Sequence, residues 1–252
     1  FTKSKFEEQE MQWESPYGRG YPGWHIECSA MSMKYLGEQF DIHCGGIDHI
    51  NIHHTNEIAQ SEAATGKKPW VKYWLHGEFL VIGKDKDKMA KSGENFLTLS
   101  LLEERGYSPL DYRYFCLGTH YRMPLTFSFE AQEGAKNARK RLNEKVLEYK
   151  KSKDKVEDRN AHPYLERFTA DVNDDLNISR PLALVWEVLK DGKLNDAEKY
   201  SLLLKFDEIL GLGLKDAKEE KVDVPAKVKK LAEERLLARK NKEWNKSDQL
   251  RD

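Results

Sequence analysis

Residues 25–46 read HIECSAMSMKYLGEQFDIHCGG. Ile26, Ala30 and Met33 recur at the spacing of one helix face, so the stretch predicts a helix over residues 25–36. Gly37 follows the last apolar position and is a common helix stop. The short run after it predicts a buried strand over residues 39–43. The stretch therefore predicts a helix and a strand joined by a glycine turn.

The same alternation continues downstream. Residues 53–65 have helical spacing and end at Gly66. Residues 78–83 contain four consecutive apolar side chains and end in a glycine, which predicts a second short buried strand. Because strands that alternate with helices usually pair in parallel, the first half of the chain predicts an α/β fold with a parallel sheet.

Composition changes near residue 130. Twelve of the 16 glycines, seven of the eight histidines and all three cysteines precede this position. The later half is poor in glycine, rich in Lys, Glu, Leu and Ala, and has 28 basic against 25 acidic residues, a helical composition. The predicted helices are 130–150, 181–190, 195–210 and one from near Pro225, with a charged connection at 151–160. The predicted fold class is α/β followed by an α-helical bundle.

The overall composition excludes several classes of protein. Of 252 residues, 39% are hydrophobic and 34% charged, which is typical of a soluble globular chain and not of a disordered one. No apolar run approaches the roughly 20 residues of a membrane span. The net charge of −1 gives no bulk positive field for a nucleic acid. Three cysteines fit a reducing compartment, so we expect a cytoplasmic protein.

Candidate metal ligands occur in two nearby segments. His53 and Glu57 are four residues apart, so on a helix they share one face and could bind the same ion. Cys28 could add a thiolate from the neighbouring helix, and all three side chains are good zinc ligands. The alternative is a surface His–Glu pair beside a cysteine that acts as a small buried hydrophobe. Spacing alone favours this alternative.

Two lysines form a second candidate site. Lys88 and Lys91 follow the predicted strand at 78–83, in a polar loop that reads KMAKS over residues 88–92. Lysines at the carboxyl end of a strand can bind phosphates where an α/β sheet holds a nucleotide. The alternative is a solvated run of charge, which is the better interpretation of a lysine cluster by itself.

Taken together, the motifs resemble a known family, the cysteinyl-tRNA synthetases of class I. They are GWHIEC (23–28), HCGGID (43–48), HHTNE (53–57), KMAKS (88–92), YRYF (112–115), HYR (120–122), the Asp-rich 171–177, AR (238–239), Trp244 and QLRD (249–252). Their order and spacing match the family over nearly the whole chain, most weakly over about 145–165 and 190–225. The resemblance implies the second half of a Rossmann-like catalytic domain over residues 1–105. A stem-contact-like helical connection follows over 106–160 and an α-helical bundle on the tRNA anticodon side over 161–252.

The resemblance also implies a zinc ion bound by two cysteines, a histidine and a glutamate. Cys28, His53 and Glu57 fall on three of these ligands. The zinc would receive the substrate thiolate, which a serine hydroxyl cannot imitate. This selectivity would need no editing site, because a pocket alone separates close analogues by only ~1–3 kcal/mol.

Three further side chains are implied to contact the substrates. Trp24 would form a wall of the substrate pocket, Asp48 would face the substrate amine or ribose, and His43 would lie on the nucleotide side. Each has a structural alternative: Trp24 could fill the core, Asp48 could cap a helix, and His43 could be a buried ring with its hydrogen bonds satisfied.

Lys88 and Lys91 fall on the signature lysines of class I enzymes, which stabilise the pyrophosphate of ATP, with Mg²⁺ expected beside it. Ala90 replaces the usual serine of this signature, and Cys44 replaces a usual glycine of the HCGG stretch. The His-x-Gly-His signature, the second cysteine ligand and the terminal anticodon module of the family do not occur in the sequence. We therefore expect a piece of the enzyme that cannot form cysteinyl-adenylate by itself.

The implied function is that of a cysteine–tRNA ligase: L-cysteine is activated with ATP and transferred to tRNA(Cys) by a monomer without a membrane partner. Basic side chains late in the chain would contribute to tRNA affinity, namely Lys229, Lys230, Arg239 and Lys240. One alternative is the related ligase that joins cysteine to an amino-sugar inositol for mycothiol. Another is a zinc-stabilised binding module without catalysis. The basic helical half disfavours the first and the two lysines disfavour the second.

Overall fold

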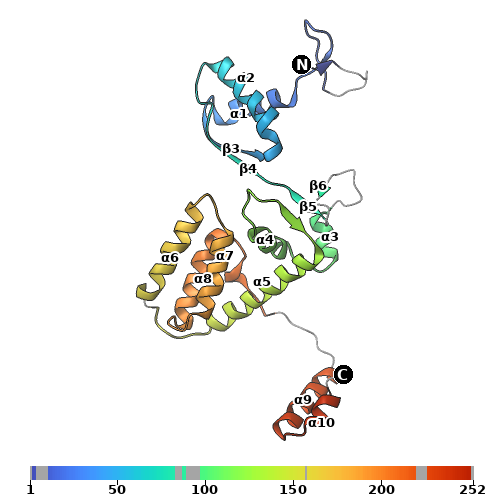
Figure 1. The fold of residues 1–252 in the computed structure, drawn as a ribbon, viewed down its shortest axis with the longest axis vertical. Helices are drawn as coiled ribbons and strands as arrows, with labels where there is room; N and C mark the ends of the chain where they lie inside the picture. The colour runs from blue at the N-terminus through green and yellow to red at the C-terminus, as the bar shows by residue number, and fades with distance from the viewer. Residues whose placement is uncertain are drawn as a thin grey trace. The chain divides into compact units, whose positions relative to one another are not determined.

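The computed structural model describes residues 2–3, 11–82, 87–88, 97–156, 158–219 and 226–250. The chain divides into a larger compact unit, Phe1–Lys215, and a smaller one, Asp216–Asp252. The larger unit begins with α/β elements and continues into helices (Figure 1). The domain boundaries expected at 105 and 160 stay predictions.

The first predicted helix is confirmed. Helix α1 spans Trp24–Leu36 and ends at Gly37, whose φ of 94° favours glycine and whose N–H donates to the carbonyl of Met33. Helix α2, Thr55–Thr65, ends at the left-handed Gly66, as predicted. A 3₁₀ turn, Ile47–His49, and a π-helical turn, Ile50–His54, precede α2. His53 therefore lies in the π turn and not in α2 itself.

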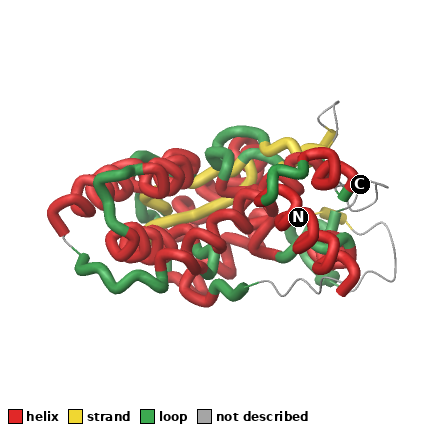
Figure 2. The backbone as a smooth tube through the Cα atoms, turned by 90° about the horizontal axis from the view of Figure 1, so that it is seen from below, coloured by secondary structure: helices red, strands yellow, loops and turns green. Residues whose placement is uncertain are grey.

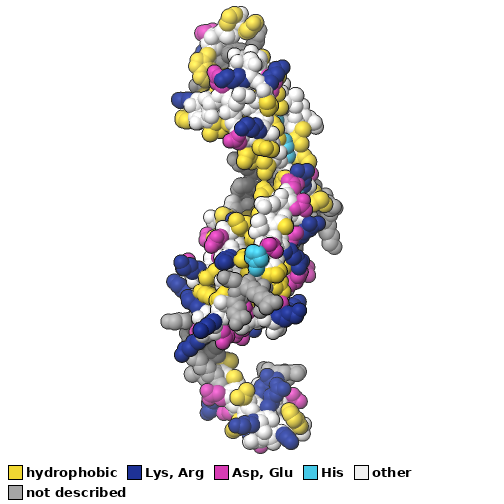
Figure 3. Space-filling view, turned by 90° about the vertical axis from the view of Figure 1, so that its left-hand side faces the viewer, with side chains coloured by type: hydrophobic (Ala, Val, Ile, Leu, Met, Phe, Trp, Pro, Cys, Tyr) yellow, Lys and Arg dark blue, Asp and Glu magenta, His cyan; other side chains and the backbone are white. Residues whose placement is uncertain are grey.

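Parallel pairing is confirmed, but the two predicted strands belong to different sheets, and the first pairs with a strand that the pattern did not predict. Strand β3, Phe40–Gly46, pairs in parallel with β4, Val71–Gly77, and the two run side by side in Figure 2. The prediction that the first strand is buried is wrong. Ile42 is 57% exposed, and Ile52 and Tyr73 in neighbouring segments are more exposed still. Hydrophobic side chains accordingly lie open among charged ones on the surface in Figure 3.

A second, three-stranded sheet follows. Strand β5, Leu80–Ile82, pairs in parallel with β7, Leu125–Phe127, and antiparallel with β6, Asp87–Lys88. Val81 and Phe127 are buried, which agrees with the burial predicted for the strand at 78–83. A short antiparallel pair near the start joins β1, Thr2–Lys3, and β2, Gly20–Tyr21.

The predicted helices of the second half are confirmed at nearly the predicted bounds. The helices of the larger unit after the first sheet are α3 Leu99–Glu104, α4 Pro109–Leu117, α5 Phe129–Tyr149, α6 Asp158–Asn173, α7 Ser179–Lys190 and α8 Asp196–Leu210. A 3₁₀ turn, Leu214–Asp216, follows. Ser108 and Asn195 begin α4 and α8 with complete capping boxes.

Helix α6 differs from the prediction of a charged connection over 151–160, because it already begins at Asp158. Its sequence is polar, but one face packs on the bundle: Phe168 stacks on Phe206 of α8 with ring centroids 4.2 Å apart. Leu203, Phe206 and Leu210 are fully buried, as their helical spacing predicts. Only the first residues of α6 therefore differ from the prediction, since the rest lies within the helical bundle expected over 161–252.

Two helices form the described part of the smaller unit. Helix α9 spans Ala226–Lys240 and α10 spans Trp244–Gln249. The Nε of Arg235 donates to the carbonyl of Ser247 over 3.2 Å, and Ala238 and Ser247 are buried where the helices meet. The helix predicted from near Pro225 is confirmed from Ala226 onward. Within the described residues, no helix of either unit combines the length and apolar character needed to cross a membrane.

Candidate metal centre

Three segments bring the proposed metal ligands together. Cys28 comes from α1, His53 from the π turn and Glu57 from the first turn of α2. One ligand atom of each residue, the thiol sulfur, a ring nitrogen and a carboxylate oxygen, lies within 4.8 Å of the others. Glu57 is fully buried and His53 is 8% exposed. The surface-pair alternative is therefore wrong for His53 and Glu57, because neither lies on the surface.

The two carboxylate oxygens of Glu57 differ. Oε2 accepts a hydrogen bond from Nε2 of His43 over 2.9 Å. Oε1 has no hydrogen-bond partner among the described residues and lies 3.7 Å from Nε2 of His53. A buried carboxylate oxygen without a partner lowers the stability of the fold, because it has lost its hydrogen bonds to water and no other hydrogen bond replaces them. A cation between Glu57, His53 and Cys28 would compensate that charge, so the residues present fit a zinc ion.

A cluster of histidine rings surrounds this centre. His54 contacts His76, with Nδ1 and Nε2 2.8 Å apart, and its ring lies 4.7 Å from that of His43. Burial, followed by the neighbouring imidazoles, lowers the pKa of His54 to about 4, and burial also lowers the pKa of His53 and His76. Neutral imidazoles keep a free nitrogen lone pair, which metal binding requires.

The thiol at the centre needs a cation to ionise. Burial first, and then the charges of Glu57 and Glu27, raise the pKa of Cys28. A bound divalent ion is itself the largest local charge and stabilises a thiolate. The metal centre without a cation therefore disfavours the thiolate of Cys28, and a bound cation would favour it.

Glycines allow the close packing of the HCGG stretch. A Cβ on Gly45 would lie 2.5 Å from Cε1 of His54, and one on Gly46 would lie 2.5 Å from Oδ1 of Asp48. Any side chain there would displace the rings or the carboxylate. Cys44 is exposed and stands opposite Leu75 in the regular β3–β4 ladder, so it replaces the family's glycine without crowding the centre.

The other predicted substrate contacts lie close by. The Trp24 ring lies 4.2 Å from that of His53 and 59% of Trp24 is exposed, so its alternative as a core filler is wrong. Asp48 lies in the 3₁₀ turn before the π turn. His43 is hydrogen-bonded to Glu57, so the alternative interpretation of His43, a ring with a satisfied hydrogen bond, agrees with the structure. Contacts of these three residues with substrate stay predictions.

One of the two predicted lysines belongs to the second sheet. Lys88 lies in β6, opposite Val81 of β5. Lys91 lies outside the described residues, as does the side chain of Lys88. Their role toward a phosphate stays a prediction.

Sequence reasoning missed two histidines of the site, His54 and His76. His54 and His43 form with Glu57 a second group whose ligand atoms lie within 4.8 Å of one another, and His76 contacts His54. The adjacent pair His53-His54 was a usable signal for the first. His76 had none, because it lies near the end of β4, the strand that the pattern did not predict.

Comparison with known proteins identifies relatives of the chain. The family described as tRNA synthetases class I (C) catalytic domain matches residues 2–137. A cysteine–tRNA ligase of Treponema denticola is 47% identical over 100% of this chain and 56% of its own length. Cysteine–tRNA ligase 1 of Burkholderia lata is 45% identical over 97% of this chain and 50% of its own length. The chain thus spans about half the length of these curated relatives.

A solved structure supports the fold alone. LeuRS in the ternary complex from Agrobacterium radiobacter K84 superposes with a TM-score of 0.58 at 14% identity, covering 83% of this chain and 33% of that one. The likeness supports the α/β fold with appended helices and, at this identity, carries no argument about substrates.

Proposed function

The chain belongs to the class I (C) tRNA synthetase catalytic-domain family, and from this premise we propose that the protein is a cysteine–tRNA ligase. In this proposal it activates L-cysteine with ATP and transfers it to tRNA(Cys) in the cytoplasm, as a monomer. The single observation that carries the proposal is the buried Glu57, whose Oε1 lacks a partner among the described residues and lies beside Cys28 and His53. Relatives named as cysteine–tRNA ligases at 45–47% identity support it.

Cys28, His53 and Glu57 would bind a zinc ion in this enzyme. When bound, zinc supplies a soft Lewis acid that prefers a thiolate to a hydroxyl. The residues of the chain prepare the site: His43 holds Oε2 of Glu57, and Oε1 would be the oxygen that binds the ion. Trp24 would shield the substrate side chain from water, and Asp48 would bind the substrate amine or ribose.

Lys88 and Lys91 would bind the phosphates of ATP together with Mg²⁺. Activation moves negative charge onto the pyrophosphate when the cysteine carboxylate attacks the α-phosphate. Two ammonium groups at that position stabilise the transition state more than they stabilise bound ATP, and this difference accelerates the reaction. Ala90 removes a hydroxyl from this segment but neither positive charge, so we expect at most a tuned rate.

Cysteine-dependent exchange of pyrophosphate into ATP tests the proposal directly. For the full-length protein we expect exchange with cysteine, none with serine, and charging of tRNA(Cys) as the second step. Exchange with cysteine but transfer only to an amino-sugar acceptor would indicate the mycothiol enzyme. Zinc binding without any exchange would indicate a binding module. Either result would overturn the proposed function.

A further inference from the structure

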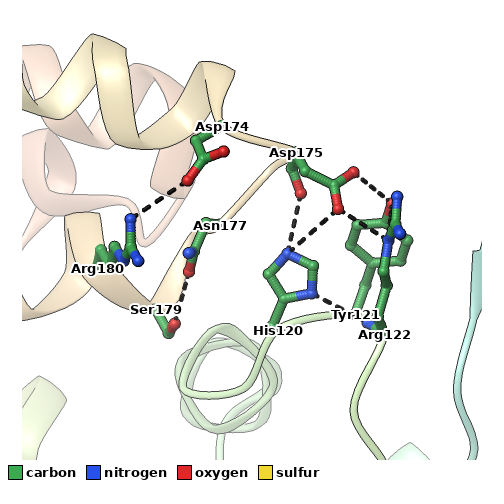
Figure 4. Close-up of polar contacts among 8 residues, drawn as sticks. All are labelled: His120, Tyr121, Arg122, Asp174, Asp175, Asn177, Ser179 and Arg180. Carbon is green, nitrogen blue, oxygen red and sulfur yellow. Dashed lines mark hydrogen bonds and ion pairs between the residues drawn. The ribbon is translucent and has the colours of Figure 1, made fainter.

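Two motifs that the proposed chemistry does not use contact each other. Tyr121 and Arg122 lie in the loop before β7, and Asp175 lies in the turn between α6 and α7 (Figure 4). Tyr121 Oη donates to Oδ1 of Asp175 over 2.7 Å, and Arg122 Nε lies 2.8 Å from Oδ2. One carboxylate thus binds two consecutive side chains that are more than fifty residues away in the sequence.

His120 adds a third contact to the same turn. The backbone N–H of Arg122 donates to Nδ1 of His120 over 3.2 Å, so Nδ1 carries no proton. Nε2 then carries the proton and donates to the carbonyl of Asp175 over 3.0 Å. The ring stacks on Tyr121 with centroids 4.8 Å apart. Both the side chain and the backbone of Asp175 are therefore bound. We call these contacts the Asp175 junction.

The turn at this junction has a strained backbone. Asp175 and Leu176 have φ values of 56° and 54°, a left-handed conformation that non-glycine residues rarely adopt, least of all in succession. Leu176 is 48% exposed, so burial of its side chain does not fix this conformation. Such strain persists only where surrounding contacts impose it. Arg180 bonds Asp174 over 3.2 Å on one side of the turn, and the Asp175 junction binds the other.

The loop with Tyr121 is also bonded to the sheet that carries Lys88. The N–H of Glu78 donates to the carbonyl of Tyr121 over 2.8 Å, and the N–H of Leu125 donates to the carbonyl of Phe79 over 3.0 Å. Strand β7 then pairs with β5, and β5 pairs with β6, where Val81 stands opposite Lys88. A continuous series of hydrogen bonds therefore links Asp175 in the helical bundle to the backbone of Lys88.

We infer that Asp175 is a positioning residue, which fixes the β5–β6–β7 sheet against the helical bundle and thereby holds Lys88 where ATP is bound. This inference rests on the proposed function for the role of Lys88. The strained turn supports it, because the chain could form an ordinary surface ion pair without two left-handed residues. The competing interpretation is a contact that contributes to stability alone.

The test compares three variants of the full-length protein. Asp175→Ala removes both side-chain bonds of the carboxylate. Asp175→Asn tolerates the left-handed backbone and still accepts from Tyr121, but it loses the charge that faces Arg122. Glu187→Gln is the matched control. It breaks the ion pair between Glu187 of α7 and Arg167 of α6, the two helices on either side of the Asp175 turn, and this pair does not contact the sheet.

Steady-state pyrophosphate exchange separates positioning from stability. For Asp175→Ala we expect kcat to fall roughly ten- to a hundredfold, as a displaced catalytic group does, with the KM for cysteine unchanged. Asp175→Asn should recover most of this loss, and Glu187→Gln should match the parent. An unchanged kcat in a folded Asp175→Ala protein, or an equal loss in Glu187→Gln, would overturn the inference. If Asp175→Ala does not fold, Tyr121→Phe takes its place with the same expectations.

Backbone hydrogen exchange gives a readout that does not depend on activity. We expect faster exchange of the amides in β5 and β6 in Asp175→Ala, and unchanged exchange there in Glu187→Gln. If the parent protein shows no cysteine-dependent activity, the proposed function fails, and hydrogen exchange still tests the junction. Unchanged exchange in these strands would overturn the inference even for an active enzyme.

Discussion

The interiors of the helical bundle and of the metal centre are built from opposite kinds of side chain. In the bundle, Leu203 and Phe206 are fully buried, and the helix that carries them begins with a complete capping box. In the metal centre, the buried groups are Glu57, His53 and His54, while apolar Ile52 nearby is 68% exposed. The bundle is arranged for stability. The centre keeps a buried carboxylate with one oxygen unpartnered among the described residues, which costs stability and is useful only if a ligand compensates it.

Breaking the bundle should have the largest effect on stability. Phe206→Ala removes a fully buried ring that stacks on Phe168, so we expect the free energy of unfolding to fall by ~3–5 kcal/mol. Urea denaturation measures this change. Zinc content of the folded fraction should stay at the level of the parent. A joint loss of zinc in that fraction would show that the two interiors are not independent.

Removing a lysine should lower activity and leave stability nearly unchanged. Lys88→Ala and Lys91→Ala should each raise the free-energy barrier of cysteine activation by ~2.7–4 kcal/mol, because their charges act mainly in the transition state. This change slows the reaction about a hundred- to a thousandfold. Stability and cysteine affinity should change little. The measurement is pyrophosphate exchange beside a thermal melt. Parent-like activation rates in both variants would refute the assignment of these lysines.

Ligand removal tests the metal centre itself. Cys28→Ala should weaken zinc binding by more than the roughly 10–100-fold that loss of an outer-shell partner costs, because a direct ligand is gone. Glu57→Gln should also weaken zinc, yet the metal-free protein should be no less stable than its parent, since a buried charge is removed. Metal analysis and metal-free unfolding curves measure both. Full zinc occupancy in Cys28→Ala would exclude Cys28 from the ligands.

The smallest effect is expected from the basic residues of helix α9. Neutralising Lys229, Lys230, Arg239 and Lys240 together should weaken tRNA binding and flatten its salt dependence by up to about one log–log unit for each phosphate that is no longer bound. Activation of cysteine should be unchanged, because none of the four belongs to the metal centre or the lysine segment. A quadruple variant that binds tRNA like its parent over a range of salt would show that these side chains are only a solvated helix surface.

Features governed by local physics were predictable from the sequence. The stops at Gly37 and Gly66 follow from the positive φ that glycine allows. The buried face of α8 follows from its spacing, and the ligand types of Cys28, His53 and Glu57 follow from their chemistry. The family followed from the order and spacing of several motifs and is confirmed by the match over residues 2–137.

Only the tertiary structure decided what depends on distant partners. It formed β4 beside β3 and placed His76 against His54, although neither was indicated locally. It packed α6 on the bundle, where Phe168 stacks on Phe206, and it brought Asp175 of a left-handed turn within hydrogen-bond distance of Tyr121. The physical reason is the range of the interactions. Capping and helical spacing act within a few residues of the chain, whereas strand pairing, ring stacking and a shared carboxylate depend on which distant segments the fold brings within hydrogen-bond reach.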